Sequence, residues 1–215
     1  MLPEPAIILS FDTSAAHCAA ALLSGDQVLG ACLEPMQKGQ AERLFPMLEE
    51  LLAKGGKAWS DLSAIGVCTG PGNFTGLRIS VAAARGLSLS LGIPAVGVTK
   101  LEAMAYGTKG HTLSVLDARR GRIYMQAFRD EMPLDVPQMM EILDIYDQLE
   151  ETSVLRVMAD EALELKRAEP ISEVVQAVGH IAAARFNKVQ PRPAPLYLRA
   201  ADAAPPSDPP VVILQ

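Results

Sequence analysis

The side chains best suited to chemistry first appear at the end of an apolar run near the start of the chain. Residues Ala6–Thr13 are predicted to form a strand, and Asp12, Thr13 and Ser14 place a carboxylate and two hydroxyls at its tip. Such groups can contact the phosphates and metal of a nucleotide, but they are also ordinary turn residues. Glycines that would let the backbone approach phosphate are absent from the following residues, 14–17. Both interpretations stay open from these residues alone.

A second candidate site is the stretch from Gly70 to Arg78, which follows a predicted strand and opens a predicted helix. It contains Gly70, Gly72 and Asn73 at the junction. Free N–H groups and the positive end of the helix dipole gather at such a point, so an anion could bind there. The spacing fits neither the dinucleotide-binding GxGxxG pattern nor Walker A. A tight turn capped by Asn73 explains the same residues equally well.

Other catalytic or metal-binding patterns are weak. The chain has no GxSxG motif, and its three histidines lack metal-binding spacing: His17, His111 and His180. The three cysteines are odd in number and lie far apart in apolar segments: Cys18, Cys32 and Cys68. Buried reduced thiols are therefore expected rather than disulfides or thiolate ligands. We expect no catalytic residue, no metal and no cofactor.

The overall charge limits the partners that the chain can bind alone. Its 215 residues include 49% hydrophobic residues and carry a formal net charge of −6. Nucleic-acid binding depends on Lys and Arg neutralising phosphates, so an RNA partner would need basic surface from another protein. No apolar run is long enough to span a membrane, and no basic region precedes the first apolar stretch. A cytoplasmic protein is expected.

The elements that would position these residues alternate between strand and helix. Strands are predicted from short apolar runs of high β-propensity, and helices from apolar residues at helical spacing. In residues 1–99 the strands are 6–13, 18–23, 27–34, 64–69 and 93–98, and the helices are 41–54 and 74–91. Parallel strands joined by helices indicate the α/β class, with right-handed crossovers.

A second, smaller lobe is predicted over residues 100–189. It would hold helices at 100–106, 141–150 and 172–188 and strands at 112–117, 123–129 and 154–159. Residues 190–215 are rich in Pro and Ala, which favours extended structure, and only Leu196–Leu198 is expected to dock.

The predicted helix 74–91 is apolar on both sides. One side carries Ile79, Ala83 and Leu87, whereas Phe74 and Val81 lie on the other with two arginines. A helix apolar all round is normally buried on both sides. In a chain this short, the second side is as readily covered by another protein as by the second lobe.

Five segments, in this order, resemble the TsaB (YeaZ) family: FDTSAAHCAAALL, AERLFPMLEELL, CTGPGNFTGLRISVAAARGLSLSLGIP, LDARRGRIYMQAF and APLYLR. The resemblance covers nearly the whole chain. It implies the two-lobed actin-like (sugar kinase/Hsp70/actin) fold with ribonuclease H-like lobes. Asp12–Ser14 then resembles the phosphate-facing hairpin of that fold. The implied vestigial nucleotide site is Asp12, Thr13, Ser14, Gly70, Gly72 and Asn73.

The resemblance also implies a function. TsaB-like proteins are non-catalytic subunits that pair with the TsaD transferase and the TsaE ATPase, which threonylcarbamoylate the tRNA adenosine next to the anticodon. Alone they form homodimers, and tRNA is reached only through the complex. The pairing helices match residues 41–54 and 74–91 here. The partner-facing residues expected on them are Leu44, Met47, Leu48, Leu51, Phe74, Arg78, Val81 and Arg85.

Three positions depart from the family pattern, and two other functions fit the sequence less well. Gln40, Asn73 and Arg122 stand where the family usually has His, Ser and Glu. A metallopeptidase of the "glycoprotease" type would need metal ligands, which the sequence lacks. A small-molecule kinase of the same fold would need a base and phosphate-binding glycines in the second lobe, and residues 100–189 offer no convincing set.

Overall fold

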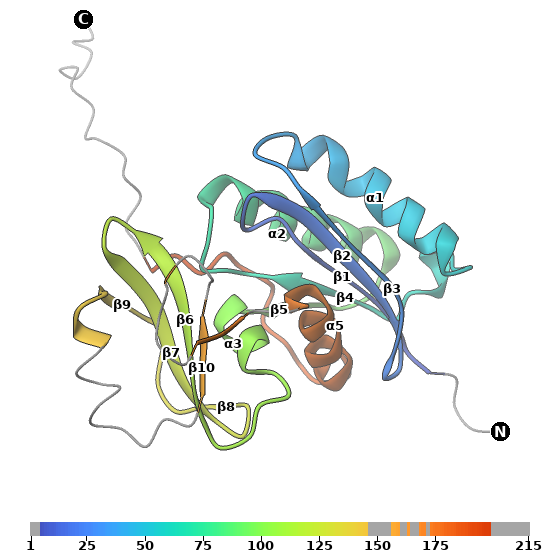
Figure 1. The fold of residues 1–215 in the computed structure, drawn as a ribbon. Helices are drawn as coiled ribbons and strands as arrows, with labels where there is room; N and C mark the ends of the chain where they lie inside the picture. Colours follow the sequence, from blue (N-terminus) through green and yellow to red (C-terminus); the bar gives the residue numbers. More distant parts are fainter. Residues whose placement is uncertain (1–4, 146–155, 160–162, 164–167, 171–172, 199–215) are drawn as a thin grey trace, which may run out of the picture.

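Two β-sheets organise the chain, the first built from its N-terminal part and the second from residues beyond 110 (Figure 1). The computed structural model describes residues 5–145, 156–159, 163, 168–170 and 173–198. No helix in this described part combines the length and the apolar character that crossing a bilayer requires.

The first sheet has the order β3-β2-β1-β4-β5. Its strands are β1 (Ile7–Asp12), β2 (His17–Ser24), β3 (Gln27–Pro35), β4 (Ala64–Cys68) and β5 (Ala95–Val98). The first three pair antiparallel, whereas β4 and β5 join parallel to β1. Every residue of β1 and β4 is buried, as expected for central strands covered on both faces. The strands predicted for residues 1–99 are all present.

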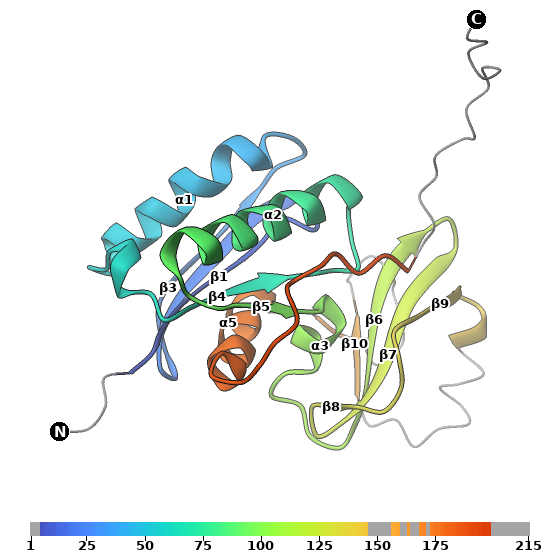
Figure 2. The ribbon, with the colours of Figure 1, turned by 180° about the vertical axis from the view of Figure 1, so that it is seen from behind.

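Two helices cover one face of this sheet, α1 (Gln40–Lys54) and α2 (Phe74–Leu91), while α5 (Val174–Arg185) covers the other (Figure 2). A short 3₁₀ helix, η1 (Trp59–Asp61), precedes β4. Arg43 attaches α1 to the edge strand, because its guanidinium donates to both oxygens of Glu34 at 2.6 and 2.7 Å. The same group donates to both oxygens of Glu50 at 2.8 Å, about two turns further along the same face of α1.

Helix α5 was predicted in the second lobe, but it packs on the first sheet. It shares a buried cluster with β1, β2, β4 and β5. A Cβ atom added at Gly179 would lie 2.4 Å from Leu23 Cδ1, and one added at Gly66 would lie 3.1 Å from Ala182 Cβ. Helix and strands therefore approach closely at these two glycines, where a larger residue would require neighbouring side chains to shift. The predicted second-lobe range 100–189 is wrong for this helix, since a long-range contact decides its place.

The second sheet has the order β11-β10-β6-β7-β8, and β9 also pairs with β7. Its strands are β6 (His111–Arg119), β7 (Arg122–Arg129), β8 (Met132–Pro133), β9 (Gln138–Glu141), β10 (Arg156–Ala159) and β11 (Ala168–Pro170). Helix α3 (Lys100–Ala105) lies between the two sheets and contacts both α5 and β6. The range 141–150 was predicted to form a helix. Glu141 is instead the last residue of β9, and residues 146–150 lie outside the described part of the chain.

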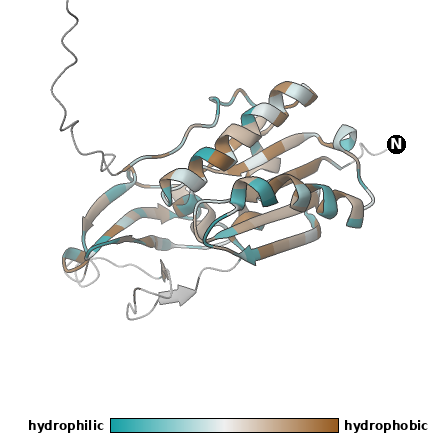
Figure 3. Ribbon diagram, turned by 90° about the horizontal axis from the view of Figure 1, so that it is seen from above, coloured by the Kyte–Doolittle hydropathy of each residue, from teal (hydrophilic) through white to brown (hydrophobic). Residues whose placement is uncertain are grey.

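The apolar stripe of α1 and the inner side of α2 face the chain's own sheet. Five residues expected to face a partner are at most 4% exposed and belong to the first core cluster: Leu44, Met47, Leu48, Leu51 and Val81. That expectation is wrong for these five, because the sheet covers the stripe. The other three, Phe74, Arg78 and Arg85, are exposed. Seen from above, the helix ribbons alternate between polar and apolar residues (Figure 3).

The outward side of α2 carries two small residues and a leucine beside the exposed Arg78 and Arg85. Ala82 and Gly86 are exposed, and Leu89 is 87% exposed. Their spacing of four and three residues places them on one helical face. We call Ala82, Gly86 and Leu89 the outer ridge.

Neighbouring positions of α2 provide a test of this arrangement. Val81→Glu should lower the free energy of unfolding by about 3 to 5 kcal/mol, because it buries an unpaired carboxylate. Ala82→Glu, one residue away and exposed, should change it by less than about 0.5 kcal/mol. Urea denaturation followed by circular dichroism measures both. Equal stability of the two variants would contradict the inward orientation of Val81.

Candidate functional site

The polar side chains of the turn between β1 and β2 are buried and form hydrogen bonds within the chain. Asp12, Thr13 and Ser14 are each at most 1% exposed. The Ser14 backbone N–H donates to Asp12 Oδ1 at 2.7 Å, and Asp12 Oδ2 lies 3.1 Å from Nε2 of His17. The Thr13 hydroxyl donates to the backbone carbonyl of Gly76 in α2 at 2.7 Å. The carboxylate and the threonine hydroxyl are thus engaged within the chain.

The loop 70–73 docks directly onto this turn. The Asn73 backbone N–H donates to the carbonyl of Ser14 at 2.6 Å, and its side chain caps α2 by accepting from the Gly76 N–H at 2.9 Å. A Cβ at Gly72 would lie 2.4 Å from Ser14 O, and one at Gly76 would lie 1.8 Å from Thr13 O. Only glycine permits this approach of backbone to backbone. The cap predicted for Asn73 is confirmed.

Asp12 remains ionised in this buried turn. Burial by itself raises the pKa of the Asp12 carboxyl, but four influences that lower it outweigh burial: the hydrogen bond with His17, the charges of Lys100 and His17, and the hydrogen bond from Ser14. The net result is a pKa of about 2, below the usual 3.8. A buried carboxylate of this kind stabilises the fold only in its charged form.

All six residues predicted as a vestigial nucleotide site therefore come together at one place: Asp12, Thr13, Ser14, Gly70, Gly72 and Asn73. The structure uses them to attach β1 to the first turn of α2. Sequence reasoning missed two contributors, His17 and Gly76. His17 begins the return strand of the hairpin, and Gly76 is the third glycine of the motif, so its spacing was the available signal.

The cysteines and the possible metal ligands are the remaining reactive groups of the described part of the chain. Cys18, Cys32 and Cys68 are free, with the first and last buried. Burial raises the pKa of the Cys18 thiol to about 11 and also raises that of Cys68, which keeps both thiols protonated. Within the described ranges, no three His, Cys, Asp or Glu side chains group closely enough to hold a metal ion.

The C-terminal segment docks beside α2, as predicted for residues 196–198. The Leu196 backbone N–H donates to the carbonyl of Thr69 at 2.8 Å. The Tyr197 ring lies 4.9 Å from that of Phe74, and its hydroxyl accepts from Arg78 Nε at 3.1 Å. The Arg78 guanidinium also lies 3.9 Å from the Phe74 ring centre. An exposed aromatic and cationic cluster thus forms at the start of α2.

The sequence is similar to proteins of a known family. A family model described as "TsaD: tRNA N6-adenosine threonylcarbamoyltransferase" matches residues 34–149. The chain is 36% identical over 130 residues to the tRNA threonylcarbamoyladenosine biosynthesis protein TsaB of Escherichia coli, covering 58% of this chain and 56% of that protein. It is 33% identical over 201 residues to an uncharacterised protein of Mycobacterium bovis, covering 92% and 94%. The match thus spans about half of the E. coli relative.

Among solved structures, YeaZ from Pseudomonas aeruginosa superimposes with a TM-score of 0.68 at 23% identity. The superposition covers 90% of this chain and 100% of that chain. At this identity the likeness concerns the fold. The two-lobed actin-like α/β fold expected from the sequence is confirmed.

Two glycines of α2 test the contact between the turn and the helix. Gly76→Ala should lower the free energy of unfolding by about 2 to 3 kcal/mol, because the new Cβ would overlap Thr13 O. Gly86→Ala should raise it by about 0.5 to 1 kcal/mol, since no described atom lies within 4 Å of the added Cβ. Thermal denaturation of both variants measures the difference. A neutral Gly76→Ala would mean that the turn does not dock this closely.

The charge on Asp12 should appear in the pH dependence of stability. Because its folded-state pKa of about 2 lies below the usual 3.8, its contribution is complete above about pH 3.8 and is lost as the pH falls toward about 2. The wild-type chain should lose about 2 kcal/mol over this window from this group. Asp12→Asn should lack that portion of the loss. Parallel curves of unfolding free energy against pH would contradict the assignment.

Proposed function

Because the chain belongs to the TsaB (YeaZ) family of tRNA threonylcarbamoyladenosine biosynthesis proteins, we propose that it is the non-catalytic subunit of a tRNA-modifying complex. In this proposal it pairs with a TsaD-like transferase and a TsaE-like ATPase. The complex threonylcarbamoylates the adenosine next to the anticodon, and this chain supplies surface rather than chemistry.

The observation that carries the non-catalytic role is the closed turn at residues 12–14. In an actin-like ATPase this hairpin would present its carboxylate and hydroxyls to the nucleotide. Here the Asp12 carboxylate is held by Ser14 and His17, and the Thr13 hydroxyl is held by Gly76. A phosphate group would have to break these buried contacts without water to replace them, which costs about 1 to 3 kcal/mol for each polar group left unpaired.

The outer ridge is the proposed pairing surface. Small side chains at Ala82 and Gly86 let another helix approach closely, and Leu89 supplies exposed apolar area at the end of the ridge. Phe45 of the neighbouring helix α1 is 43% exposed. An exposed apolar patch flanked by polar residues is typical of protein–protein contacts. The same surface would support a homodimer when the partner is absent.

Charge substitutions on the ridge test the pairing. Leu89→Glu and Ala82→Glu should each weaken co-purification with the chain's own TsaD-like transferase by at least about tenfold, because they bury a charge in the contact. Ala184→Glu is the matched control, since Ala184 is an exposed alanine of α5 on the opposite face of the sheet.

Two readouts accompany the binding measurement. Threonylcarbamoylation of tRNA by the reconstituted complex should fall with the ridge variants and persist with the control. Unchanged pairing by both ridge variants would refute this surface. Robust ATP turnover by the isolated chain that Asp12→Ala abolishes would refute the non-catalytic role.

A further inference from the structure

Helices α1 and α2 lie side by side on one face of the first sheet, so their outward sides form one surface (Figure 2). On α1 this side carries Glu42, Phe45 and Glu49, which are exposed and lie at helical spacing opposite the buried stripe. Arg43 pairs with two other glutamates, whereas Glu42 and Glu49 have no hydrogen-bond or ion-pair partner in the described part of the chain. Two unpaired carboxylates therefore flank the Phe45 ring.

The outward side of α2 is cationic and carries a small side chain between its charges. Arg78 and Arg85 are exposed and flank Ala82, and the helix contains no acidic residue. Arg78 contacts the Phe74 ring and donates to the Tyr197 hydroxyl, but neither arginine has a carboxylate partner among the residues that the structure describes. In a protein of net charge −6, two such cations on one helix face are a local departure.

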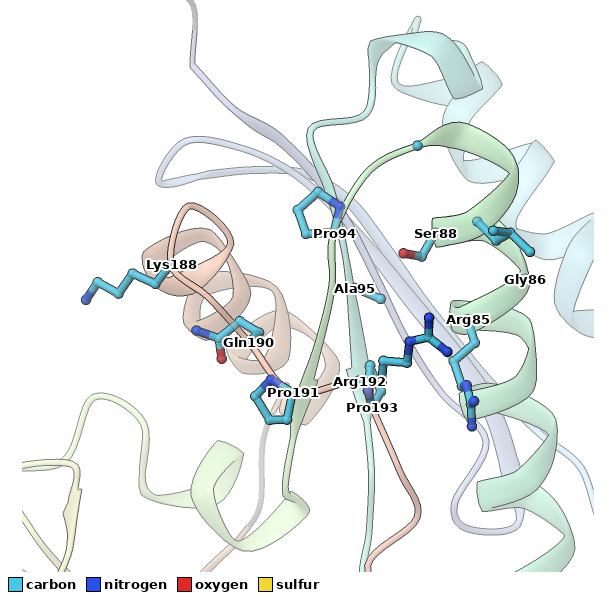
Figure 4. A pocket seen from close by; sticks show the side chains of 12 residues that line it. Arg85, Gly86, Ser88, Pro94, Ala95, Lys188, Gln190, Pro191, Arg192 and Pro193 are labelled. Carbon is cyan, nitrogen blue, oxygen red and sulfur yellow. The ribbon is translucent and has the colours of Figure 1, made fainter.

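A groove beside α2 extends its cationic side. The groove has a volume of about 620 Å³ and lies between the end of α2 and residues 188–193 (Figure 4). Arg85, Lys188 and Arg192 line it, and none of its described lining residues is acidic. A carboxylate that approaches Arg85 from outside would therefore meet further positive charge and no repulsion from the groove.

The two helix faces match in spacing as well as in charge. Glu42 and Glu49 are seven residues apart, as are Arg78 and Arg85, so the members of each pair are separated by about 10.5 Å along their helix. If α1 of one molecule lay on α2 of another, both carboxylates would reach both guanidinium groups. The phenyl ring between the carboxylates would then lie on the small side chains of the outer ridge.

We propose that two copies of this chain pair about a two-fold axis, with α1 of each copy lying on α2 of the other. In this symmetry each contact between α1 and α2 occurs twice, so both sets of carboxylates meet guanidinium groups. The alternatives, α1 on α1 or α2 on α2, would place like charges opposite each other. The inference rests on the pairing surface of the proposed function and adds the orientation of the pair and the four charged residues that set it.

The charges select the orientation, whereas the apolar contact supplies most of the affinity. Ion pairs at an accessible interface are individually weak, because water and salt screen them. Phe45 is 43% exposed in the single chain, and the small Ala82 and Gly86 leave room for its ring. Covering this ring removes apolar surface from water in both copies. Substitutions of the charged residues should therefore act mainly by creating repulsion.

Charge reversal tests the arrangement with the full chain alone. Glu42→Lys/Glu49→Lys makes both helix faces cationic and Arg78→Glu/Arg85→Glu makes both acidic, so each variant should self-associate at least about a hundredfold more weakly than the wild type. An equimolar mixture of the two should form a heterodimer within about tenfold of the wild-type affinity, because opposite charges face each other again. Sedimentation velocity at low salt measures all three samples.

Two further variants separate this arrangement from a general effect of charge. Asp26→Lys/Asp144→Lys changes the net charge by the same amount at exposed residues outside both helices, and it should dimerise like the wild type. Phe45→Ala should weaken self-association by at least about tenfold, whereas Phe45→Leu should weaken it less, because it keeps apolar area at the contact. Circular dichroism confirms that each variant is folded.

Three results would overturn the proposal. A wild-type chain that stays monomeric, reversed variants that self-associate like the wild type, or folded variants that do not pair when mixed would each exclude α1 lying on α2. None of these measurements involves the transferase. A failed homodimer together with intact co-purification would therefore leave the proposed function standing, and a failed co-purification would leave this arrangement of the homodimer untouched.

Discussion

The backbone-to-backbone contact between the β1–β2 turn and the first turn of α2 fixes the position of α2 on the first sheet. The Asn73 N–H bonds the Ser14 carbonyl at 2.6 Å, and Gly72 and Gly76 lie where any Cβ would overlap the turn. Because β1 is the central strand and α2 covers the sheet, this contact sets the rotation of α2 about its axis. That rotation decides that Val81 faces inward, the outer ridge faces outward and Arg85 faces the C-terminal segment.

Local sequence patterns predicted the elements of the first lobe because each has a strong period of its own. The apolar stripe of α1 and the short buried strands need only neighbours in sequence to be recognised. The same periodicity misled the prediction of the partner surface. Large apolar residues such as Leu48 and Met47 mark the side that the sheet covers, whereas two of the three residues of the exposed ridge, Ala82 and Gly86, are small and carry little signal.

Long-range contacts explain the remaining differences. Helix α5 follows the second lobe in sequence, yet the glycines of β4 and α5 bring it to the first sheet. The six residues of the candidate site were predicted to meet, and they do. Their inward hydrogen bonds were not predictable, because the Thr13 acceptor is a helix carbonyl 63 residues away. Likewise, residues 188–193 lie beside the end of α2 only because α5 brings the chain back to the first sheet.

The packing of α5, a late element of the sequence, on the first sheet also has a consequence during synthesis on the ribosome. The first sheet and the helices on one of its faces are complete by Val98, but its other face is covered only by α5, which begins at Val174. At translation rates of about 5 to 20 residues per second, the 75 residues between them take roughly 4 to 15 seconds. During that interval the nascent sheet would leave Ile8, Val96 and Val98 uncovered on that face. A holding chaperone would have its natural binding site on this face until the last helix emerges.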